Sequence, residues 1–498
     1  MTLGGQIMNK QIGFALFACL LFTLLPFTGM ATQQTETNTI TITIETIRSL
    51  EKKDLQFHFE KIIDETTDPD FYIKIWIDNQ LFESDTYLNT KYLYDLNWQA
   101  NKQVSNEDIE IPIKIQLWDE ADEDITEDRI CDLSAKFGKS ESACEINLIY
   151  NQHTGHWTGD DTRGDPSGYG RLNGCDDGSF YEQELDCELW FDITQDDPDG
   201  DGIPSWMETV RYDTDPTLDD TGTDYDNDDV STEWEWKWGY DPMTFNDHMN
   251  LDPDGDSITN WEEYYMKNWG SDPFRVDLFV EMDQMKGPNG EPGMFPEGAK
   301  EILYTAYNRQ NVLYHLDDGK MGSESRADLI PFDELTECSW GEQDELDDIY
   351  DTYFLNQQDA DIRRSIFHYG VVIYQSSQVN GNAFGPNRYQ VSALGMENKA
   401  DELFLRQVAN KDIVYASAYM HEMGHSLNFR PIPGHNRLSY YPWQPLFWLS
   451  RIYKSCMNYG YMFYVVDYSD GSRPNLGRLS GDYDDWERMD LSYFEEDW

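Results

Sequence analysis

Two histidines and one glutamate in the segment Ile413 to Phe429 have the types and spacing of a metal site that activates water. His421 and His425 lie four residues apart and Glu422 follows the first, in the order H-E-x-x-H. On a helix such residues lie one turn apart on the same face, so both imidazoles can reach one metal ion. A bound Zn²⁺ lowers the pKa of its water, and Glu422 can take the proton as general base. The alternative is that these histidines only pack or cap the helix.

The residues that follow include a candidate third ligand. Asn428, three residues after His425, tolerates the positive φ with which a chain can leave a helix. The segment resembles the metzincin zinc metalloproteases, which carry a third histidine six residues after the second; here that position is Pro431, which has no metal-binding atom, and the next histidine is His435 in P-G-H-N. We predict that His435 is the third zinc ligand, and an ordinary loop histidine is the alternative.

Downstream the chain reads Ser455-Cys456-Met457-Asn458-Tyr459. Together with H-E-M-G-H, this segment resembles the metzincin zinc metalloproteases, whose signature is H-E-x-x-H-x-x-G-x-x-H followed by a turn with a methionine. The resemblance covers residues 274–498. It implies that Met457 packs beneath the three imidazoles, that Tyr459 donates a hydrogen bond to the developing oxyanion, and that the substrate is a protein or peptide.

Residues 195–273 contain three acidic loops whose starts lie 27 and 28 residues apart. Each loop has carboxylates at positions 1, 3 and 5, an aliphatic residue at 7 and Glu at 12, the spacing of an EF-hand Ca²⁺ loop. The loop residues are Asp197, Asp199, Asp201, Ile203 and Glu208; Asp224, Asp226, Asp228, Val230 and Glu235; and Asp252, Asp254, Asp256, Ile258 and Glu263. We predict three calcium sites, with an acidic linker as the alternative.

Each loop precedes a predicted helix and a shared Asp-Pro ending, which resembles the thrombospondin type 3 calcium repeats of secreted prokaryotic proteins. The resemblance implies a spacer that calcium makes rigid. Asp229 and Ser257 replace the glycine at position 6 of the second and third loops, so a weaker second site is expected. Trp206, Trp234 and Trp261 are predicted to pack between the repeats.

Residues 32–194 read as a β-sandwich because apolar and polar residues alternate in several segments. The clearest are 39–47, 71–77 and 109–118. Acidic turns beside two of these segments resemble the calcium-binding loops of the membrane-binding domains typified by protein kinase C. That resemblance implies ligands at Asp68, Asp70, Asp119, Asp122 and Asp124. Solvated acidic turns are the alternative.

From residue 274 the pattern predicts a β-α-β unit, with strands at 275–284 and 311–316 and a helix at 296–309. A buried strand is predicted at 367–375 and an edge strand at 387–394, which would bind a substrate backbone as an added strand. The predicted fold is multidomain, with a β-sandwich, calcium-loop repeats and a C-terminal α+β metzincin-like domain.

The whole chain has 498 residues with 95 acidic and 36 basic side chains, a formal charge of −59. This balance disfavours nucleic acid and anionic membranes as partners. Residues 1–31 resemble a secretory signal, with an uncleaved anchor as the alternative. The even number of cysteines after it predicts disulfides, and proximity favours 131–144, 175–187 and 338–456 among many possible pairings.

The sequence therefore predicts a secreted or cell-surface zinc endopeptidase that calcium stabilises. Zn²⁺ and Ca²⁺ are its expected cofactors, and the β-sandwich is expected to attach it to a substrate or surface. The alternative is a non-enzymatic, calcium-dependent adhesion protein with a structural or vestigial metal site. The presence of Glu422 favours the enzyme, because a purely structural site needs no base there. The sequence does not determine the oligomeric state.

Overall fold

The computed structural model describes residues 37–50, 68–121, 127–178, 185–321, 325–338, 341–357, 359–376, 379–404, 410–473 and 482–494. The expected signal at 1–31 lies outside these residues, as do Asp122 and Asp124. Among the described residues, no helix is both long enough and apolar enough to cross a bilayer.

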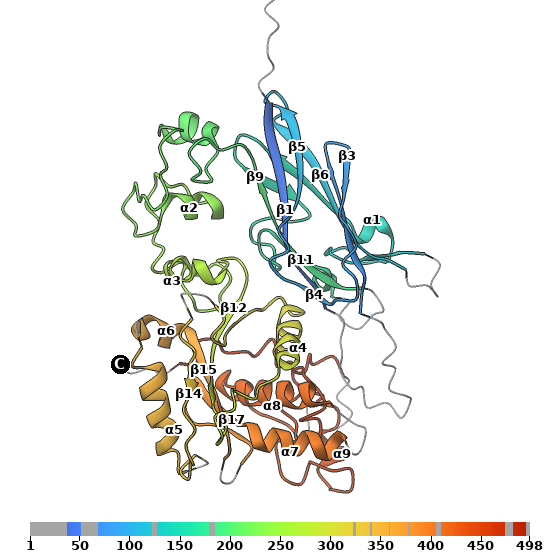
Figure 1. The fold of residues 1–498 in the computed structure, drawn as a ribbon, viewed down its shortest axis with the longest axis vertical. Helices are drawn as coiled ribbons and strands as arrows, with labels where there is room; N and C mark the ends of the chain where they lie inside the picture. The colour runs from blue at the N-terminus through green and yellow to red at the C-terminus, as the bar shows by residue number, and fades with distance from the viewer. Residues whose placement is uncertain are drawn as a thin grey trace, which may run out of the picture. The chain divides into compact units, whose positions relative to one another are not determined.

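Two antiparallel sheets form the N-terminal β-sandwich (Figure 1). One contains β1 (Thr37–Ser49), β4 (Tyr92–Leu93), β5 (Trp98–Ser105), β10 (Arg171–Asn173) and β11 (Cys187–Thr194). The other contains β2 (Phe71–Ile77), β3 (Gln80–Glu83), β6 (Glu110–Asp119), β7 (Arg129–Cys131), β8 (Ile146–Asn151) and β9 (His156–Gly159). The short helices α1 (Glu141–Cys144) and η1 (Gly174–Asp177) lie in the connections. These two sheets confirm the predicted β-sandwich fold.

Strand β1 shows how the alternation of apolar and polar residues predicts a strand. Ile40, Ile42 and Ile44 are fully buried, as a period of two requires. The pairing of β1 with β11 then shifts register between Ile44 and Thr46, and the next buried isoleucine is Ile47. The irregularity moves the inward face by one residue, so both halves of the strand contribute to the same core.

Each acidic loop is followed by a helical turn, as predicted. These turns are η2 (Met207–Tyr212), α2 (Thr232–Trp238) and α3 (Asn260–Tyr265), and the short η3 (Lys267–Trp269) follows the last. Trp234 is buried and Trp261 is partly buried against the sandwich core. The prediction for Trp206 was wrong, because this side chain is 37% exposed and stacks on the His153 ring.

The C-terminal part is built on a mixed sheet in the order β13-β12-β15-β17-β16, with β14 also paired to β12. Strands β12 (Asp277–Met285), β13 (Leu313–Asp317), β14 (Leu329–Ile330), β15 (Phe367–Ile373) and β17 (Arg388–Ser392) are parallel to their neighbours. Strand β16 (Gly381–Ala383) is antiparallel to β17. The predicted edge strand at 387–394 was therefore wrong, since β16 covers β17 and forms the edge.

Helices pack on both faces of this sheet. Alternation along β12 sends Leu278 and Val280 into a core shared with α4 (Glu297–Asn308), α7 (Ala393–Phe404) and α8 (Lys411–Ser426). It sends Phe279 to the other face, against α5 (Asp344–Ile349), η5 (Tyr350–Phe354) and α6 (Ala360–Ile366). The short α9 (Phe447–Ser450) follows α8. The predicted β-α-β unit is confirmed in β12, α4 and β13.

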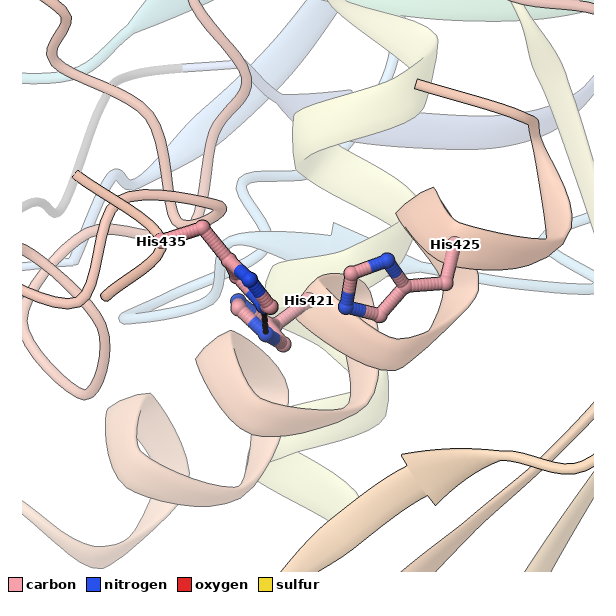
Figure 2. A group of neighbouring side chains, drawn as sticks. All are labelled: His421, His425 and His435. Carbon is pink, nitrogen blue, oxygen red and sulfur yellow. Dashed lines mark hydrogen bonds between the residues drawn. The ribbon is translucent and has the colours of Figure 1, made fainter. Parts of the chain in front are cut away.

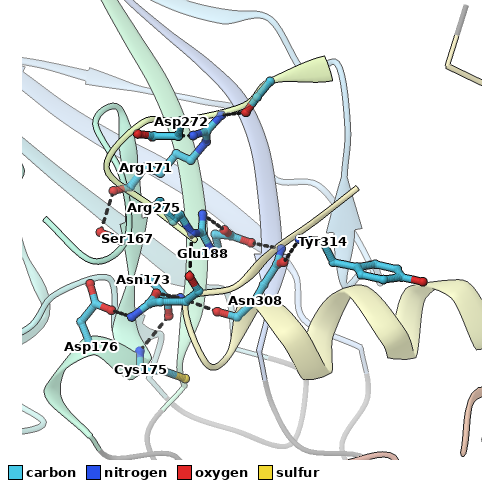
Figure 3. Close-up of polar contacts among 12 residues, drawn as sticks. Ser167, Arg171, Asn173, Cys175, Asp176, Glu188, Asp272, Arg275, Asn308 and Tyr314 are labelled. Carbon is cyan, nitrogen blue, oxygen red and sulfur yellow. Dashed lines mark hydrogen bonds and ion pairs between the residues drawn. The ribbon is translucent and has the colours of Figure 1, made fainter. Parts of the chain in front are cut away.

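A buried ion pair joins strand β11 to the segment before β12 (Figure 3). Arg275 Nη1 lies 3.0 Å from Glu188 Oε1, and both side chains are almost completely buried. Asn308 Nδ2 donates to Glu188 Oε2 at 2.8 Å, so both carboxylate oxygens are satisfied. Arg171 pairs with Asp272 at 2.7 Å in the same region. These contacts tie the sandwich to the β-α-β unit.

The predicted disulfides were wrong: the structure forms no disulfide among the described cysteines, all six of which are buried. Cys338 and Cys456 belong to the cores on opposite faces of the mixed sheet, which separates that pair. For 131–144 and 175–187, closeness along the chain did not predict the bonding partner. The Cys144 thiol instead donates to the Gly138 carbonyl at 3.4 Å.

Replacing Glu188 with glutamine would leave Arg275 buried without a charged partner. We expect the free energy of unfolding to fall by about 3 kcal/mol at neutral pH. Burial alone would raise the pKa of Glu188, but Arg275 and Arg48 lower it below the ordinary 4.5. The wild-type advantage is therefore present above pH 4.5 and is lost as the pH falls through the lowered pKa. Urea unfolding at neutral and acidic pH measures both effects.

The matched control is Asp241→Asn. Asp241 pairs with Arg211 at 2.9 Å and both side chains are exposed, so the loss should stay near 1 kcal/mol or below. Equal losses in the two variants at neutral pH would contradict the importance of the buried pair.

Candidate functional site

Helix α8 positions the H-E-x-x-H residues. Asn410 caps its start, because the Asn410 side-chain oxygen accepts a hydrogen bond from the Ile413 amide at 2.9 Å. The helix is buried along almost its whole length and packs against α4, α7 and strands β15, β16 and β17. It ends at Ser426, and Asn428 has a φ of 57°, as predicted for the exit. The histidines therefore stand on a rigid element.

The three predicted histidines meet at one point (Figure 2). The rings of His421 and His435 are nearly parallel, with 5.2 Å between centroids, and the His425 ring stands edge-on to both. The Nε2 atoms of His421 and His435 are 3.3 Å apart. Ligand nitrogens of all three lie within 4.8 Å of one another. His421 and His425 come from the helix, and His435 comes from the loop beyond it.

The protonation of these rings suits metal binding. His421 Nδ1–H donates to the Cys456 carbonyl oxygen at 2.8 Å. Because a carbonyl only accepts, the proton is on Nδ1 and Nε2 carries a lone pair. Burial lowers the pKa of His421 well below 6.5, that of His425 to about 3 and that of His435 to about 4. All three imidazoles are neutral at neutral pH, which is the form that binds metals.

The spacing of the nitrogens also fits zinc. A tetrahedral zinc with bonds of about 2.05 Å places two ligand nitrogens about 3.3 Å apart. The separation of the His421 and His435 Nε2 atoms is 3.3 Å. Two lone pairs at this distance repel each other unless a proton or a cation lies between them. The residues present therefore fit a three-histidine zinc site.

Glu422 lies beside this cluster on α8. It is buried, and burial raises the pKa of its carboxyl to about 8. Burial is the cause of this shift, and the described residues form no ion pair with the Glu422 carboxylate. Gly381 on the edge strand β16 lies directly against it, and a Cβ at that position would collide with the carboxylate. The Glu422 carboxylate is thus available to a substrate or a water.

The segment 455–459 lies beneath and beside the histidines. Met457 is fully buried, and its sulfur lies against Gly424, the residue before His425. The Tyr459 ring lies 4.2 Å from that of His435 and 5.6 Å from that of His421, measured between centroids. Burial raises the pKa of Tyr459, so its phenol stays protonated and can donate a hydrogen bond. Both residues lie next to the histidines, as the resemblance implies.

Sequence reasoning missed the two residues that hold His435. Gly434 has a φ of 79°, and its carbonyl accepts from the Tyr459 amide at 3.3 Å. A Cβ at Gly434 would collide with the side-chain amide of Asn458. Asn458 in turn donates to the carbonyls of Ser450 and Tyr453. The only available signal was the position of Gly434 and Asn458 inside P-G-H-N and S-C-M-N-Y.

A row of aromatic rings leads outward from the histidines. Tyr459 stacks on Tyr440 at 4.7 Å, Tyr440 lies 6.2 Å from Tyr441, and Tyr441 stacks on Trp443 at 4.5 Å. Trp443 is 77% exposed. We call Tyr440, Tyr441 and Trp443 the aromatic row. An exposed apolar surface that begins at a candidate site is a binding surface for apolar groups.

The three acidic loops fold as small cages of carboxylates. Asp197, Asp199 and Asp201 converge, as do Asp224, Asp226 and Asp228. In the third loop, the amides of Gly255, Ser257 and Ile258 donate to Asp252 and Asp256. The glutamates at position 12, which are Glu208, Glu235 and Glu263, are buried with no hydrogen bond of normal geometry to either oxygen.

Burial and neighbouring carboxylates raise the pKa values in these loops. The pKa rises to about 7 for Glu208 and Glu235, to about 9 for Asp254 and to about 8 for Asp256. Buried carboxylates without partners are costly, and a divalent cation relieves both the burial and the repulsion. The oxygen ligands of the first and third loops fit Ca²⁺.

The acidic turns of the sandwich are engaged differently. Asp119 pairs with Arg129 at 2.6 Å and accepts from the Asp70 amide at 2.9 Å. Asp68 lies 3.5 Å from the Lys91 ammonium. These carboxylates already have basic or amide partners, as solvated structural turns do.

Comparisons with known proteins assign no family. No family model and no curated protein match the chain. Human GIVD cytosolic phospholipase A2, solved with an inhibitor and terbium chloride, matches at 14% identity and a TM-score of 0.18, over 32% of this chain and 17% of that one. The calcium-bound pair of C2 domains from Extended-Synaptotagmin 2 matches at 15% and 0.18, over 31% and 44%. A single C2 domain matches at 11% and 0.17, over 32% and 97%. At these TM-scores the similarities assign neither a fold family nor a ligand.

The left-handed residues of the third loop allow a test of its backbone. Ser257 has a φ of 76° and Gly255 a φ of 81°, with open space around the latter. A side chain in this conformation costs about 1 kcal/mol. In calcium, we therefore expect Ser257→Gly to raise the free energy of unfolding by about 1 kcal/mol and Gly255→Ala to lower it by a similar amount. Shifts in the same direction on urea unfolding would contradict this explanation.

Proposed function

We propose that this protein is a zinc-dependent endopeptidase that calcium stabilises and that acts outside the cell. The observation that carries the proposal is the convergence of three neutral imidazoles beside the buried carboxylate of Glu422. A structural zinc site needs four protein ligands and no base, whereas a catalytic site keeps one position open. Three histidines with an adjacent glutamate favour the enzyme over an adhesion protein with a vestigial site.

The zinc would be held by His421, His425 and His435, and when bound it would polarise the attacking water and the scissile carbonyl. The positive charge of a bound zinc would lower the pKa of the buried Glu422 carboxyl, so that its carboxylate can take a proton from the water as the new carbon–oxygen bond forms. Glu422 then delivers this proton to the leaving nitrogen as the carbon–nitrogen bond breaks. The Tyr459 phenol donates a hydrogen bond to the carbonyl oxygen as negative charge develops on it.

Two surfaces would hold the substrate. The edge of β16 can pair with an extended peptide, and Gly381 in this strand lies directly against the Glu422 carboxylate. The aromatic row can bind an apolar side chain on the side of Tyr459. Calcium would occupy the acidic loops and neutralise their buried carboxylates.

The test of the chemistry is Glu422→Gln. Glutamine keeps the size of the side chain and cannot accept the proton, so we expect kcat to fall about 100-fold or more on a quenched fluorescent peptide library. Zinc content, measured by elemental mass spectrometry, should not change. Tyr459→Phe should lower kcat with little effect on KM. Undiminished cleavage by the Glu422→Gln protein would overturn the proposal.

Substrate binding by the aromatic row is tested with Trp443→Ala. Because Trp443 is largely exposed, its loss should leave stability and kcat unchanged and raise KM about tenfold for peptides with large apolar side chains. Phe245→Ala, at a 63% exposed position in the repeats, is the matched control and should change neither parameter. An unchanged KM in the Trp443 variant would exclude the row from substrate binding.

A further inference from the structure

In each repeat, a later segment of the chain returns to the fifth-position aspartate. The Asp220 amide donates to Asp201 Oδ2 at 3.3 Å, and the Asp277 amide donates to Asp256 Oδ2 at 2.8 Å. In the second repeat the Asn246 amide donates to Asp228 Oδ2 at 3.1 Å. The returning segment therefore places one more side chain beside each cage.

The chemistry of that side chain differs between repeats. In the first repeat, the Asp220 carboxylate completes a buried group with Asp201 and Glu208 whose oxygens could hold one ion. In the second, Asn246 stands at the position of Asp220, and the buried group is completed by His248, two residues later, with Asp228 and Glu235. One cage thus has a nitrogen where another has an oxygen.

The imidazole of His248 is held in place and directed at the cage. Its Nε2 lies 3.3 Å from Asp228 Oδ2 and 3.6 Å from Glu235 Oε1, and the side chain is completely buried. The Trp234 and Tyr240 rings pack edge-to-face with it, and Asn260 Nδ2 lies 3.1 Å from its Nδ1. Within the described part of the chain, neither His248 Nε2 nor the oxygens of Glu235 make a hydrogen bond of normal geometry.

A proton on His248 would not balance this cage. One imidazolium adds a single positive charge against Asp224, Asp226, Asp228 and Glu235, whose carboxylates lie within one loop and its helix. A divalent ion supplies twice that charge and also occupies the lone pair of Nε2. Imidazole nitrogen is a ligand for first-row transition metals, whereas Ca²⁺ selects oxygen.

We propose that the second repeat binds a first-row divalent transition metal, such as Zn²⁺, through His248, Asp228 and Glu235. This ion replaces the Ca²⁺ expected there from the sequence, and the oxygen-lined first and third loops keep Ca²⁺. The site shares no residue with the cluster of His421, His425 and His435, and so it does not depend on the proposed peptidase activity.

The experiment uses the full chain, stripped of metal and dialysed against zinc with calcium in large excess. Elemental mass spectrometry should find about two zinc ions in the wild type, and about one in His248→Asp and in His425→Ala. The double variant should bind none. His248→Asp introduces the side chain found in the first repeat, so the lost zinc should be replaced by an added calcium. Circular dichroism checks folding, and His248→Asn is the substitute if the aspartate variant does not fold.

The reciprocal control is Asp220→His. A nitrogen ligand in the first repeat should add a zinc ion and remove a calcium ion from that loop. Wild-type zinc content retained in both folded His248 variants, or calcium at the second loop of the wild type, would overturn the proposal. Loss of zinc only in His425→Ala would support the peptidase site alone, so the two proposals can fail separately.

Discussion

The three glutamates that close the acidic loops constrain the whole molecule. Glu208, Glu235 and Glu263 are buried, and their oxygens make no hydrogen bond of normal geometry to the described residues. A folded chain with such groups is stable only when their charge is balanced. The requirement for charge balance in the third loop also affects the C-terminal sheet, because Asp277 is the first residue of β12 and its backbone amide donates a hydrogen bond to Asp256. Cation binding at the third loop would therefore be linked to folding of the C-terminal sheet.

The features that the sequence predicted well depend on short-range periodicity. The spacing of His421, Glu422 and His425 fixes one helix face, whatever the rest of the chain does. The alternation in β1 fixes one sheet face. The loops are equally local, because each cage is closed by a residue only 11 positions after its first aspartate, as from Asp197 to Glu208. His435 was predicted because the resemblance to metzincins implies a third histidine after the helix, and the structure places it beside His421.

The features that the sequence did not predict depend on tertiary placement. Strand β16 is three residues long and reads G-N-A, which carries no strand pattern, so its neighbour β17 was mistaken for the edge. Cys338 and Cys456 belong to separate cores because the sheet lies between them. A lone His248 carries no signal of its own, and only the return of the chain brings it to Asp228. Trp206 shares the loop position of Trp261, but it stacks on His153 at the surface.

Because of Gly381, the proposed site would bind the peptide backbone through one set of residues and discriminate between peptides through another. Gly381, the residue of the edge strand next to Glu422, has no side chain, so a peptide paired there would be recognised at this position through its amide and carbonyl groups, which every sequence offers. Discrimination between peptides would then fall to the exposed residues after His435, which take no part in holding the histidines. Substitutions in that loop could change the range of accepted sequences without disturbing the chemistry, and this arrangement favours evolutionary diversification of substrate choice.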